Sequence, residues 1–325
     1  MPQWEECVMD VSWDGGPAMD HYPDRLENIY RAMMQGLADY VKKSGFTDVM
    51  LGLSGGMDSA LVAAVAGDAL GAEHVHCIRL PSRYTAELSN SAAEDMCRAW
   101  GFSMDTLPIG KTVEAATQTL APLAPDGLKK LTAENMQARA RGYLLMTVSN
   151  DRNWLLLSTG NKSEIAVGYA TLYGDMCGGF NPLKDVFKTT VYELAEWRNR
   201  TRPDGFLGPD DIAIPVEIIE RPPSAELAPD QKDTDSLPPY PVLDAILEMM
   251  VEQQAPLADI VAKGFEQTTV ERVYRMLKLA EYKRRQGAPG PKTSYRAFSR
   301  ERRFPIVNGF YAGMIAELHA MEKNG

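Results

Sequence analysis

The sequence predicts an α/β fold, a doubly wound parallel sheet with helices on both faces and a helical C-terminal part. Three observations support this prediction. Short apolar runs alternate with segments of helical periodicity through the first half of the chain, which is the pattern of a parallel sheet covered on both sides. A glycine turn joins the first apolar run to the helix that follows it. Polar residues stand where three of the runs end, at the sheet edge where ligands bind.

The elements of the first half follow in a regular order. Residues 1–24 are irregular and are predicted to form an N-terminal arm, so the domain is expected to span residues 25–325. Apolar residues at helical spacing predict a first helix over 25–43. Pro81 closes the second strand, and Thr132 is a capping signal for the last helix of this half. The strands are expected at 49–53, 74–80, 103–109 and 154–158, and the other helices at 58–70, 90–100 and 131–149.

The second half is predicted to be helical, with two interruptions. Helical spacing returns at 242–251, 257–263 and 269–285. Residues 205–240 are rich in Pro and Asp, and residues 286–300 begin with a run of Gly and Pro. Both are expected to be mobile loops that close over a ligand, because closure excludes water from a reactive intermediate.

The composition is that of an ordinary globular protein. The chain of 325 residues is 45% hydrophobic and 24% charged. No apolar stretch approaches the ~20 residues that cross a bilayer, and the first residues do not resemble a secretory signal. The four cysteines form no C-x-x-C pair, as is usual for thiols in a reducing compartment. A cytoplasmic protein without a membrane partner is therefore predicted.

Charge is unevenly distributed along the chain. The net charge of −10 argues against a nucleic-acid partner. Residues 271–303 contain eleven Lys or Arg and three Glu, which gives +8 for this segment and −18 for the rest. Such a segment indicates either a local anionic ligand or a solvated helix face with a basic loop, and charge alone does not separate the two.

The glycine turn is the most informative stretch of the sequence. Ser54-Gly55-Gly56-Met57-Asp58-Ser59 lies between a predicted strand and a predicted helix. Such a turn exposes backbone N–H groups at the positive end of a helix, where phosphate binds. Gly55 and Gly56 let an anion approach the backbone. Asp58 would repel phosphate, so its presence indicates a magnesium ion that the phosphates share.

This string resembles the pyrophosphate loop of the N-type ATP pyrophosphatases, which cleave ATP to AMP and pyrophosphate. It has neither the ending of a Walker A loop nor a G-x-G-x-x-G fingerprint. Later segments narrow the resemblance to the NAD synthetases, and the combined pattern covers residues 25–292. These segments are residues 158–164, 167–169, 171–175, 182–189, 223–227, 237–240 and 281–284.

The resemblance implies an HUP-type nucleotide fold and an amide-forming carbon–nitrogen ligase with magnesium as its cofactor. ATP and deamido-NAD would be the substrates. The nicotinate carboxylate would attack the α-phosphate of ATP, and ammonia would then displace AMP to leave NAD. Adenylation is required because a carboxylate has no good leaving group. The enzyme's contribution would be positioning and charge neutralisation, and the family resemblance also implies a homodimer.

The resemblance also assigns roles to individual residues. Asp58 and Glu164 would share magnesium, and Asp175 would hold the incoming ammonium and help to deprotonate it. Taken singly, each assigned residue could equally be a solvated, capping or ion-paired side chain. The ATP contacts would be Ser54, Gly55, Gly56, Asp58, Ser59, Arg79, Thr159, Lys188 and Ser224, and the deamido-NAD contacts would be Asn135, Arg139, Glu164, Tyr282 and Lys283.

Two positions depart from the small ammonia-dependent synthetases. Leu172 stands where those proteins carry a lysine, and Gly179 where they carry an aspartate. The strings at 171–175 and 237–240 are more similar to the synthetase portion of the glutamine-dependent enzymes, which carry an N-terminal glutaminase. Residues 1–24 are too few for such a domain. The chain would therefore use free ammonia, depend on a separate glutaminase, or be a fragment of a longer protein.

Two other functions remain open at the level of sequence. Another pyrophosphatase of the same class, such as a GMP synthetase or a tRNA-thiolating enzyme, would share the glycine turn. The acidic net charge and the lack of paired cysteines argue against a tRNA partner. A non-catalytic nucleotide sensor would share the fold, but it would not need Asp58, Glu164 and Lys188 together.

Overall fold

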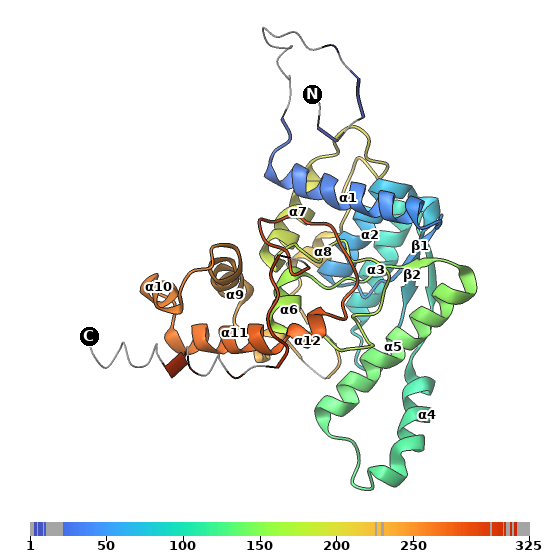
Figure 1. The fold of residues 1–325 in the computed structure, drawn as a ribbon. Coiled ribbons are helices and arrows are strands. Elements are labelled where there is room, and N and C mark those ends of the chain that lie inside the picture. The colour runs from blue at the N-terminus through green and yellow to red at the C-terminus, as the bar shows by residue number, and fades with distance from the viewer. Residues whose placement is uncertain are drawn as a thin grey trace.

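The computed structural model of the protein describes residues 3–4, 6–8, 10, 22–224, 226–228, 231–299, 301–307, 309, 313 and 315–316. Most of the predicted arm, residues 1–2, 5, 9 and 11–21, therefore lies outside the described residues. Figure 1 shows a sheet flanked by helices, with a group of helices to one side. Nowhere in the part of the chain that is described does a helix have the length and apolarity needed to span a bilayer.

The four strands form one parallel sheet, which confirms the predicted fold class. They are β1 (Val49–Gly52), β2 (Val75–Arg79), β3 (Ser103–Thr106) and β4 (Leu155–Leu156), in the order β3-β2-β1-β4. Val49 of β1 is in register with Val75 on one side and Leu155 on the other. Each strand lies within its predicted range, although β3 and β4 are shorter than predicted.

Helices account for most of the remaining chain (Figure 1). They are α1 (Arg25–Lys43), α2 (Met57–Leu70), α3 (Glu87–Trp100), α4 (Gly110–Leu120), α5 (Lys130–Arg152), α6 (Lys162–Val167), α7 (Lys188–Arg200), α8 (Val216–Glu220), α9 (Tyr240–Leu247), α10 (Leu257–Ala262), α11 (Gln267–Leu279) and α12 (Glu281–Arg284). Short 3₁₀ turns lie at η1 (Ala72–His74), η2 (Ala121–Leu123) and η3 (Asp233–Asp235), and a π-helical turn, η4 (Glu248–Glu252), follows α9.

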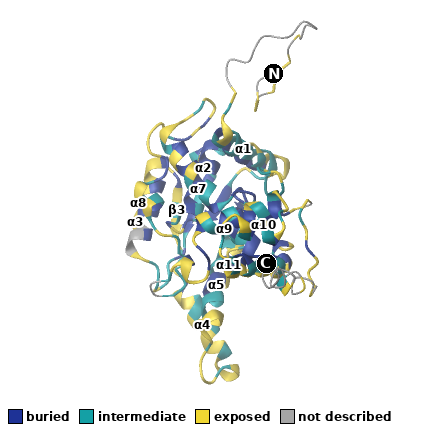
Figure 2. Cartoon of the chain, turned by 90° about the vertical axis from the view of Figure 1, so that its left-hand side faces the viewer, coloured by how far each residue is buried: buried dark blue, intermediate teal, exposed yellow. Residues whose placement is uncertain are grey.

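The side chains of β1 show why both faces of the sheet are covered. Val49 and Leu51 point into a core made with α1, α2 and α7. Met50 points to the opposite face, into a second core with α5. Alternate residues of a strand face opposite sides, so a strand that is apolar throughout must be covered on both. Figure 2 shows the resulting buried centre, with exposed residues on the outer helices.

A third core lies beside the sheet and holds the helical C-terminal part together. Its buried side chains come from α6, α9, α10 and α11, with Phe298 and Phe304 from the chain after α12. In Figure 1 these helices lie on the side of the molecule away from α5. This confirms the predicted helical character of the second half.

An ion pair in the first core fixes α7 against α2. Arg198 donates to both carboxylate oxygens of Asp68, at 2.7 and 2.9 Å, and both side chains are fully buried. Tyr30 of α1 also donates to Asp68, at 2.6 Å. This contact holds the C-terminal part of α7 (Lys188–Arg200) against α2.

Several predicted boundaries were wrong. The helix predicted over 269–285 is interrupted at Ala280, between α11 and α12. The helix predicted over 242–251 begins earlier, at Tyr240, and ends in the π-helical turn. Helices α4, α6, α7 and α8 were not predicted. The helix α7 has buried residues at helical spacing, Val191, Leu194 and Ala195, so its pattern was readable.

The segment 205–240 is more than a surface loop. It contains α8 and η3, and its side chains Phe206, Ala213, Ile214 and Ile218 are buried in the first core. Residues 225, 229 and 230 of this segment lie outside the described part. The apolar residues between the prolines therefore anchor much of the segment to the body of the protein.

Candidate active site

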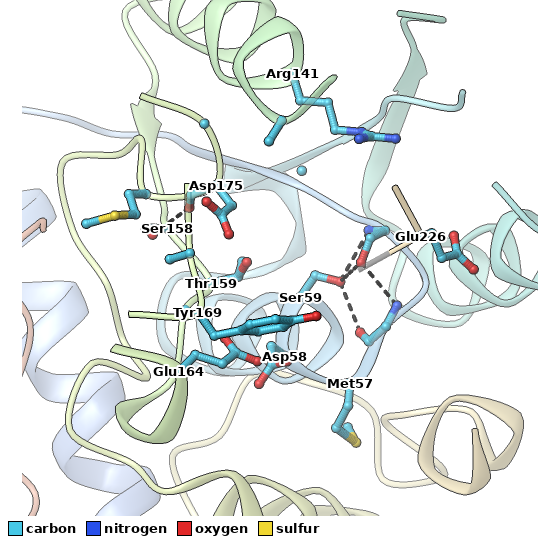
Figure 3. Close-up of a pocket in the computed structure, with 18 of the residues that line it drawn as sticks. Met57, Asp58, Ser59, Arg141, Ser158, Thr159, Glu164, Tyr169, Asp175 and Glu226 are labelled. Carbon is cyan, nitrogen blue, oxygen red and sulfur yellow. Dashed lines mark hydrogen bonds between the residues drawn. The ribbon is translucent and has the colours of Figure 1, made fainter. Parts of the chain in front are cut away.

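The carboxyl ends of β1, β2 and β4 border a cavity of about 310 Å³, seen in close-up in Figure 3. This volume lies within the range of small-molecule sites. Three predicted residues stand at these strand ends: Ser54 after β1, Arg79 at the end of β2 and Thr159 after β4. The cavity is thus at the edge of the sheet where parallel α/β folds bind ligands.

The glycine turn forms one wall of this cavity. Gly55 has a φ of +76°, and a Cβ at this position would lie 2.2 Å from the carbonyl oxygen of Ser89, so only glycine fits. The hydroxyls of Ser54 and Ser59 are 3.0 Å apart, and the Ser59 hydroxyl donates to Gly56 O at 3.0 Å. No side chain caps the start of α2. Its first backbone N–H groups are therefore available to an anion.

Asp58, Glu164 and Lys188 form a charge cluster beside the turn. The Lys188 ammonium donates to Asp58 Oδ2 and, at 3.3 Å, to Glu164 Oε1. Asn161, which is fully buried, donates to Asp58 Oδ1 at 3.0 Å and accepts from the backbone N–H of Glu164 at 3.0 Å. The three charged residues lie in the first turns of α2, α6 and α7. Three positive helix ends therefore converge on one place.

The cluster shifts the protonation of its members. Burial raises the pKa of Glu164 to about 8; the Lys188 charge opposes this shift and the Asp58 charge adds to it. Burial would lower the pKa of the Lys188 ammonium, but the negative charges of Asp58 and Glu164 outweigh burial and raise it. Lys188 therefore remains a cation, while Glu164 holds a proton near neutral pH until a further positive charge arrives.

The donor set fits a magnesium ion that is shared with a ligand. Within the described residues, no group of three or more His, Cys, Asp or Glu side chains is arranged to hold a metal alone. Magnesium is usually held by one or two carboxylates together with substrate phosphates and water. Asp58 and Glu164 supply two carboxylates next to the anion-binding turn. A cation bound there would also oppose the effect of burial, which raises the pKa of Glu164.

The other residues predicted for ATP also meet in this cavity. Arg79 donates to Glu94 at 2.5 Å and to the Thr106 hydroxyl at 3.2 Å, so its guanidinium is held at the end of β2. Ser224 donates to the carbonyl oxygen of Gln231. The lining contains Ser54, Gly56, Asp58, Ser59, Arg79, Thr159, Lys188 and Ser224. Gly55 shapes the turn from behind through its contact with Ser89.

Four of the five residues predicted for deamido-NAD, including Lys283, line a second cavity of about 340 Å³, which adjoins the first. Asn135 and Arg139 project into it from α5, and Tyr282 from α12. Arg139 Nε donates to Leu172 O at 3.2 Å, and Asn135 Oδ1 accepts from the Thr171 hydroxyl at 2.8 Å. Glu164, predicted for both substrates, lines the first cavity.

Asp175 and Lys283 lie at the border between the two cavities and line both of them. Lys283 donates to the carbonyl oxygens of Gly168 and Ala170, at 2.8 and 2.6 Å. Asp175 Oδ1 accepts from the backbone N–H of Thr171 at 2.7 Å. Burial raises the pKa of Asp175, which the Lys283 charge partly opposes. A carboxylate that can take a proton therefore stands between the cavities.

Sequence reasoning missed several residues of the first cavity. Tyr169 lines both cavities, and Figure 3 shows its ring above Asp58 and Glu164. Arg141 projects from α5 and donates to Leu80 O at 3.1 Å. Asp233 lines the cavity from η3. Tyr169 lies inside a segment that carried the family resemblance, so its sequence context could have revealed it.

The two unusual positions have different surroundings. Leu172 lines the second cavity, and its backbone oxygen holds Arg139. A Cβ at Gly179 would lie 2.6 Å from Leu155 Cδ1, so a side chain there would require Leu155 to move. Only Leu172 therefore borders a ligand cavity.

The basic C-terminal segment is used largely for structure. Arg284 donates to Ala166 O and Leu277 O, and Arg296 is bound to Glu252. Lys292 pairs with Glu301 at 2.5 Å. The +8 charge was interpreted either as a site for a local anionic ligand or as a solvated helix face with a basic loop. The first interpretation is supported mainly at Lys283, which lines both cavities.

Comparisons with known proteins identify the family of the chain. The family model described as NAD synthase matches residues 29–287. A glutamine-dependent NAD(+) synthetase from Rhodobacter capsulatus is 51% identical over 320 residues, covering 95% of this chain and 57% of that protein. A counterpart from Xanthomonas campestris is 52% identical over 308 residues, covering 94% and 53%. The chain thus spans about half the length of the curated relatives it matches.

Solved structures show the same relationship. The glutamine-dependent NAD+ synthetase from Acinetobacter baumannii, solved in complex with adenosine diphosphate, is 45% identical with a TM-score of 0.61. The match covers 92% of this chain and 54% of that one. An NH3-dependent NAD synthetase from Campylobacter jejuni has a TM-score of 0.59 at 24% identity, over 80% of this chain and 94% of that one. At that identity the likeness concerns the fold alone.

Proposed function

Because the chain belongs to the NAD synthase family, we propose that it makes NAD from deamido-NAD, ATP and ammonia, releasing AMP and pyrophosphate. One observation carries this proposal. A cavity with a phosphate-binding turn and a buried lysine adjoins a second cavity, and Asp175 and Lys283 belong to both. Two large substrates could therefore meet end to end at one border.

In the first step, an oxygen of the nicotinate carboxylate forms a bond to the α-phosphorus of ATP, and the bond from that phosphorus to the pyrophosphate oxygen breaks. Negative charge grows on the departing pyrophosphate. The Lys188 ammonium and the N–H groups at the start of α2 would stabilise that charge. Magnesium held by Asp58 and Glu164 would supply further positive charge there. Asp58→Ala should leave a folded protein with little turnover.

In the second step, ammonia forms a bond to the carboxyl carbon, and the bond from that carbon to the AMP oxygen breaks. Ammonium must lose one proton before attack and another afterwards. Asp175 stands at the border of the cavities and its pKa is raised by burial, so it is suited to hold the cation and accept a proton. Neutral ammonia would then be released beside the adenylate.

The remaining contacts divide between the two substrates. Arg79, Thr159 and Ser224 line the first cavity and would bind ATP. Asn135, Arg139 and Tyr282 line the second cavity and would bind deamido-NAD. Glu164 and Lys283 would contact deamido-NAD near its reacting end. The chain's four free thiols agree with a cytoplasmic enzyme.

We also propose that the enzyme works as a homodimer packed through α5. Leu131, Tyr143 and Met146 of this helix are exposed, and exposed apolar side chains on one element are typical of an interface. The same helix carries Asn135 and Arg139 to the second cavity, so a second chain would close that cavity. Sedimentation should give a dimer that Tyr143→Glu dissociates, and a monomeric wild type would contradict the proposal.

The predicted closure of residues 205–240 and 286–300 remains part of this proposal. Asp185 Oδ2 accepts from the backbone N–H groups of Thr293 and Ser294, at 2.9 and 2.8 Å. When residues 286–300 move, these two hydrogen bonds must either be kept or be replaced by others. Ser224 brings the other segment to the cavity. Both should exchange amide hydrogens more slowly with ATP and deamido-NAD present. Equal exchange with and without ligands would contradict closure.

The source of nitrogen can be tested together with the reaction. Relatives of about twice this length are described as glutamine-dependent. We expect NAD to form from deamido-NAD, ATP and magnesium with ammonium chloride, and glutamine to serve only when a glutaminase is added. Pyrophosphate release without NAD would indicate another acceptor. Nucleotide binding without any turnover would favour a sensor and overturn the proposal.

A further inference from the structure

A third carboxylate stands behind the Asp58–Glu164–Lys188 cluster. Asp233, the first residue of η3, is 4% exposed and lines the first cavity, where ATP would bind, which we call the nucleotide cavity. Its Oδ2 accepts a hydrogen bond from the Tyr240 hydroxyl at 2.8 Å. Its Oδ1 is buried and accepts no hydrogen bond from any residue that the structure describes. One carboxylate oxygen beside the cavity therefore lacks a donor.

A buried acceptor without a donor is costly, because the group has lost its water and gained nothing in return. Most buried polar atoms in native proteins are satisfied, so an exception calls for an explanation, such as a water or an ion. Asp233 has no cationic partner of its own among the described ion pairs, and Lys188 is already engaged by Asp58 and Glu164. The Tyr169 hydroxyl also faces Asp233, but it makes no hydrogen bond to Oδ1 in this structure. The contents of the cavity, which Asp233 lines, can supply the donor that Oδ1 lacks.

The charges around Asp233 favour a cation, with its bound water, as the source of the donor. The Tyr240 hydroxyl, which donates to Asp233, also lies 3.4 Å from Glu164 Oε1, so one side chain links Asp233 to a predicted magnesium ligand. With all three carboxylates ionised, Asp58, Glu164 and Asp233 carry −3 against +1 on Lys188, leaving −2. A divalent cation would balance this charge.

The three carboxylates do not themselves form a ligand set for a metal. Magnesium keeps several of its waters when it binds to proteins, and each bound water is a strong hydrogen-bond donor. We propose that Asp233 is a positioning residue for magnesium, accepting through Oδ1 a hydrogen bond from a water on the ion that Asp58 and Glu164 hold. This inference rests on the proposed function and extends the site to residues that bind the ion through water.

The backbone of Asp233 gives this contact a second consequence. Its N–H donates to Pro223 O at 3.2 Å, and the next residue, Ser224, lines the same cavity and donates to Gln231 O. The backbone of Asp233 is thus tied to Pro223, next to a residue that lines the same cavity. An ion held through Asp233 would therefore also help to fix Ser224 beside the phosphates.

Manganese, which can be followed by electron paramagnetic resonance, tests the proposal without measuring turnover. Free and bound Mn²⁺ would be counted with ATP present in the wild type, Asp233→Ala and Asp233→Asn. We expect both variants to bind Mn²⁺ about tenfold more weakly, the usual effect of losing an outer contact to a metal site. Asparagine keeps the shape but offers only one acceptor oxygen, so Asp233→Asn tests the contact if Asp233→Ala does not fold.

Asp244 provides a matched control. It is a buried carboxylate close to the same helices, but the Ser163 hydroxyl and the Thr189 backbone N–H already donate to its two oxygens. Asp244→Asn should lower the melting temperature and leave Mn²⁺ affinity unchanged. Unchanged Mn²⁺ affinity in folded Asp233→Asn would overturn the role of Asp233 alone. Failure of the wild type to bind Mn²⁺ with ATP would overturn the magnesium site itself, and the role of Asp233 with it.

Discussion

Helices α2 and α7 are joined by two acid–base pairs of different character. Asp58 and Lys188 pair at the start of the two helices, and Asp68 and Arg198 pair ten residues further along each helix. The two pairs are therefore about 15 Å apart. The first lines the nucleotide cavity, whereas the second is fully buried in the core. The same helix pair thus carries a candidate catalytic contact at one end and a structural contact at the other.

The hydrogen bonds show what separates the two pairs. Asp68 accepts four: two from Arg198, one from Tyr30 and one from the backbone N–H of Gly208. All its acceptor positions are filled. Asp58 accepts only from Asn161 and Lys188 among the described residues, and Lys188 must also serve Glu164. An incompletely satisfied ion pair beside a cavity is a better indication of function than burial or pairing alone.

The largest effect is expected from Lys188→Met. The variant loses the cation that would stabilise the departing pyrophosphate, and NAD formation should fall by at least about 10³-fold, as when other phosphoryl-transfer enzymes lose a positive charge. The fold should survive, because Glu164 can remain protonated in place of the lost charge. The measurements are NAD formation and thermal unfolding. A variant that turns over normally would remove the distinction between the two pairs.

Arg198→Met should have the opposite profile. It leaves Asp68 buried without its partner, and breaking a buried pair in this way costs about 3 to 5 kcal/mol of unfolding free energy. Activity per folded molecule should change little, because the nucleotide cavity is formed at the other end of the helices. Urea denaturation measures the first effect, and NAD formation at low temperature measures the second. Lys43→Met, which removes an exposed pair with Asp39, is the control and should not alter stability.

The pH dependence of the free energy of unfolding tests the charge cluster at the cavity end of the two helices. Burial raises the pKa of Glu164 to about 8 in the folded protein, above the ordinary value of 4.5 that a glutamate has in an unfolded chain. The folded state then binds more protons between these values. Stability should therefore fall as pH rises, by up to about 1.4 kcal/mol per pH unit.

In Glu164→Gln this slope should become shallower, because no carboxyl remains at that position to titrate; Asp175, whose pKa is also raised by burial, would still contribute. Urea denaturation at several pH values between 5 and 8 measures it in both proteins. Excess magnesium with ATP should flatten the slope in the wild type, because bound cation would lower the pKa of Glu164. An equal slope in the wild type and the variant would show that other groups cause it.

The sequence was sufficient to find Asp58 and Lys188 but not their counterparts in the core. Asp58 lies in the glycine turn, and Lys188 lies in a segment that resembles a known family. Asp68 and Arg198 lie in no such motif, and they meet only because α7 packs on α2. Neither burial nor the number of bonds to a carboxylate is visible before the chain is folded. Asp233 was missed for the same reason, because its free oxygen is a property of its surroundings.

The smallest expected effect comes from exchanging the two cations. Arg198→Lys keeps the charge but loses the fork that reaches both oxygens of Asp68, together with a bond to Pro209 O at 3.0 Å. Lysine cannot replace arginine at a two-point contact. With about one or two hydrogen bonds lost, the free energy of unfolding should drop by about 1 to 2 kcal/mol, which urea denaturation measures.

Lys188→Arg is the matching change at the other end. The cavity beside Lys188 has room for the larger side chain, so stability should be nearly unchanged. No acceptors there are arranged for a planar guanidinium, so NAD formation should fall. If Arg198→Lys reduced activity as much as stability, the core pair would control the position of Lys188 through α7. The two ends of the helix pair would then act as one unit, and the separation between structural and functional ion pairs would be lost.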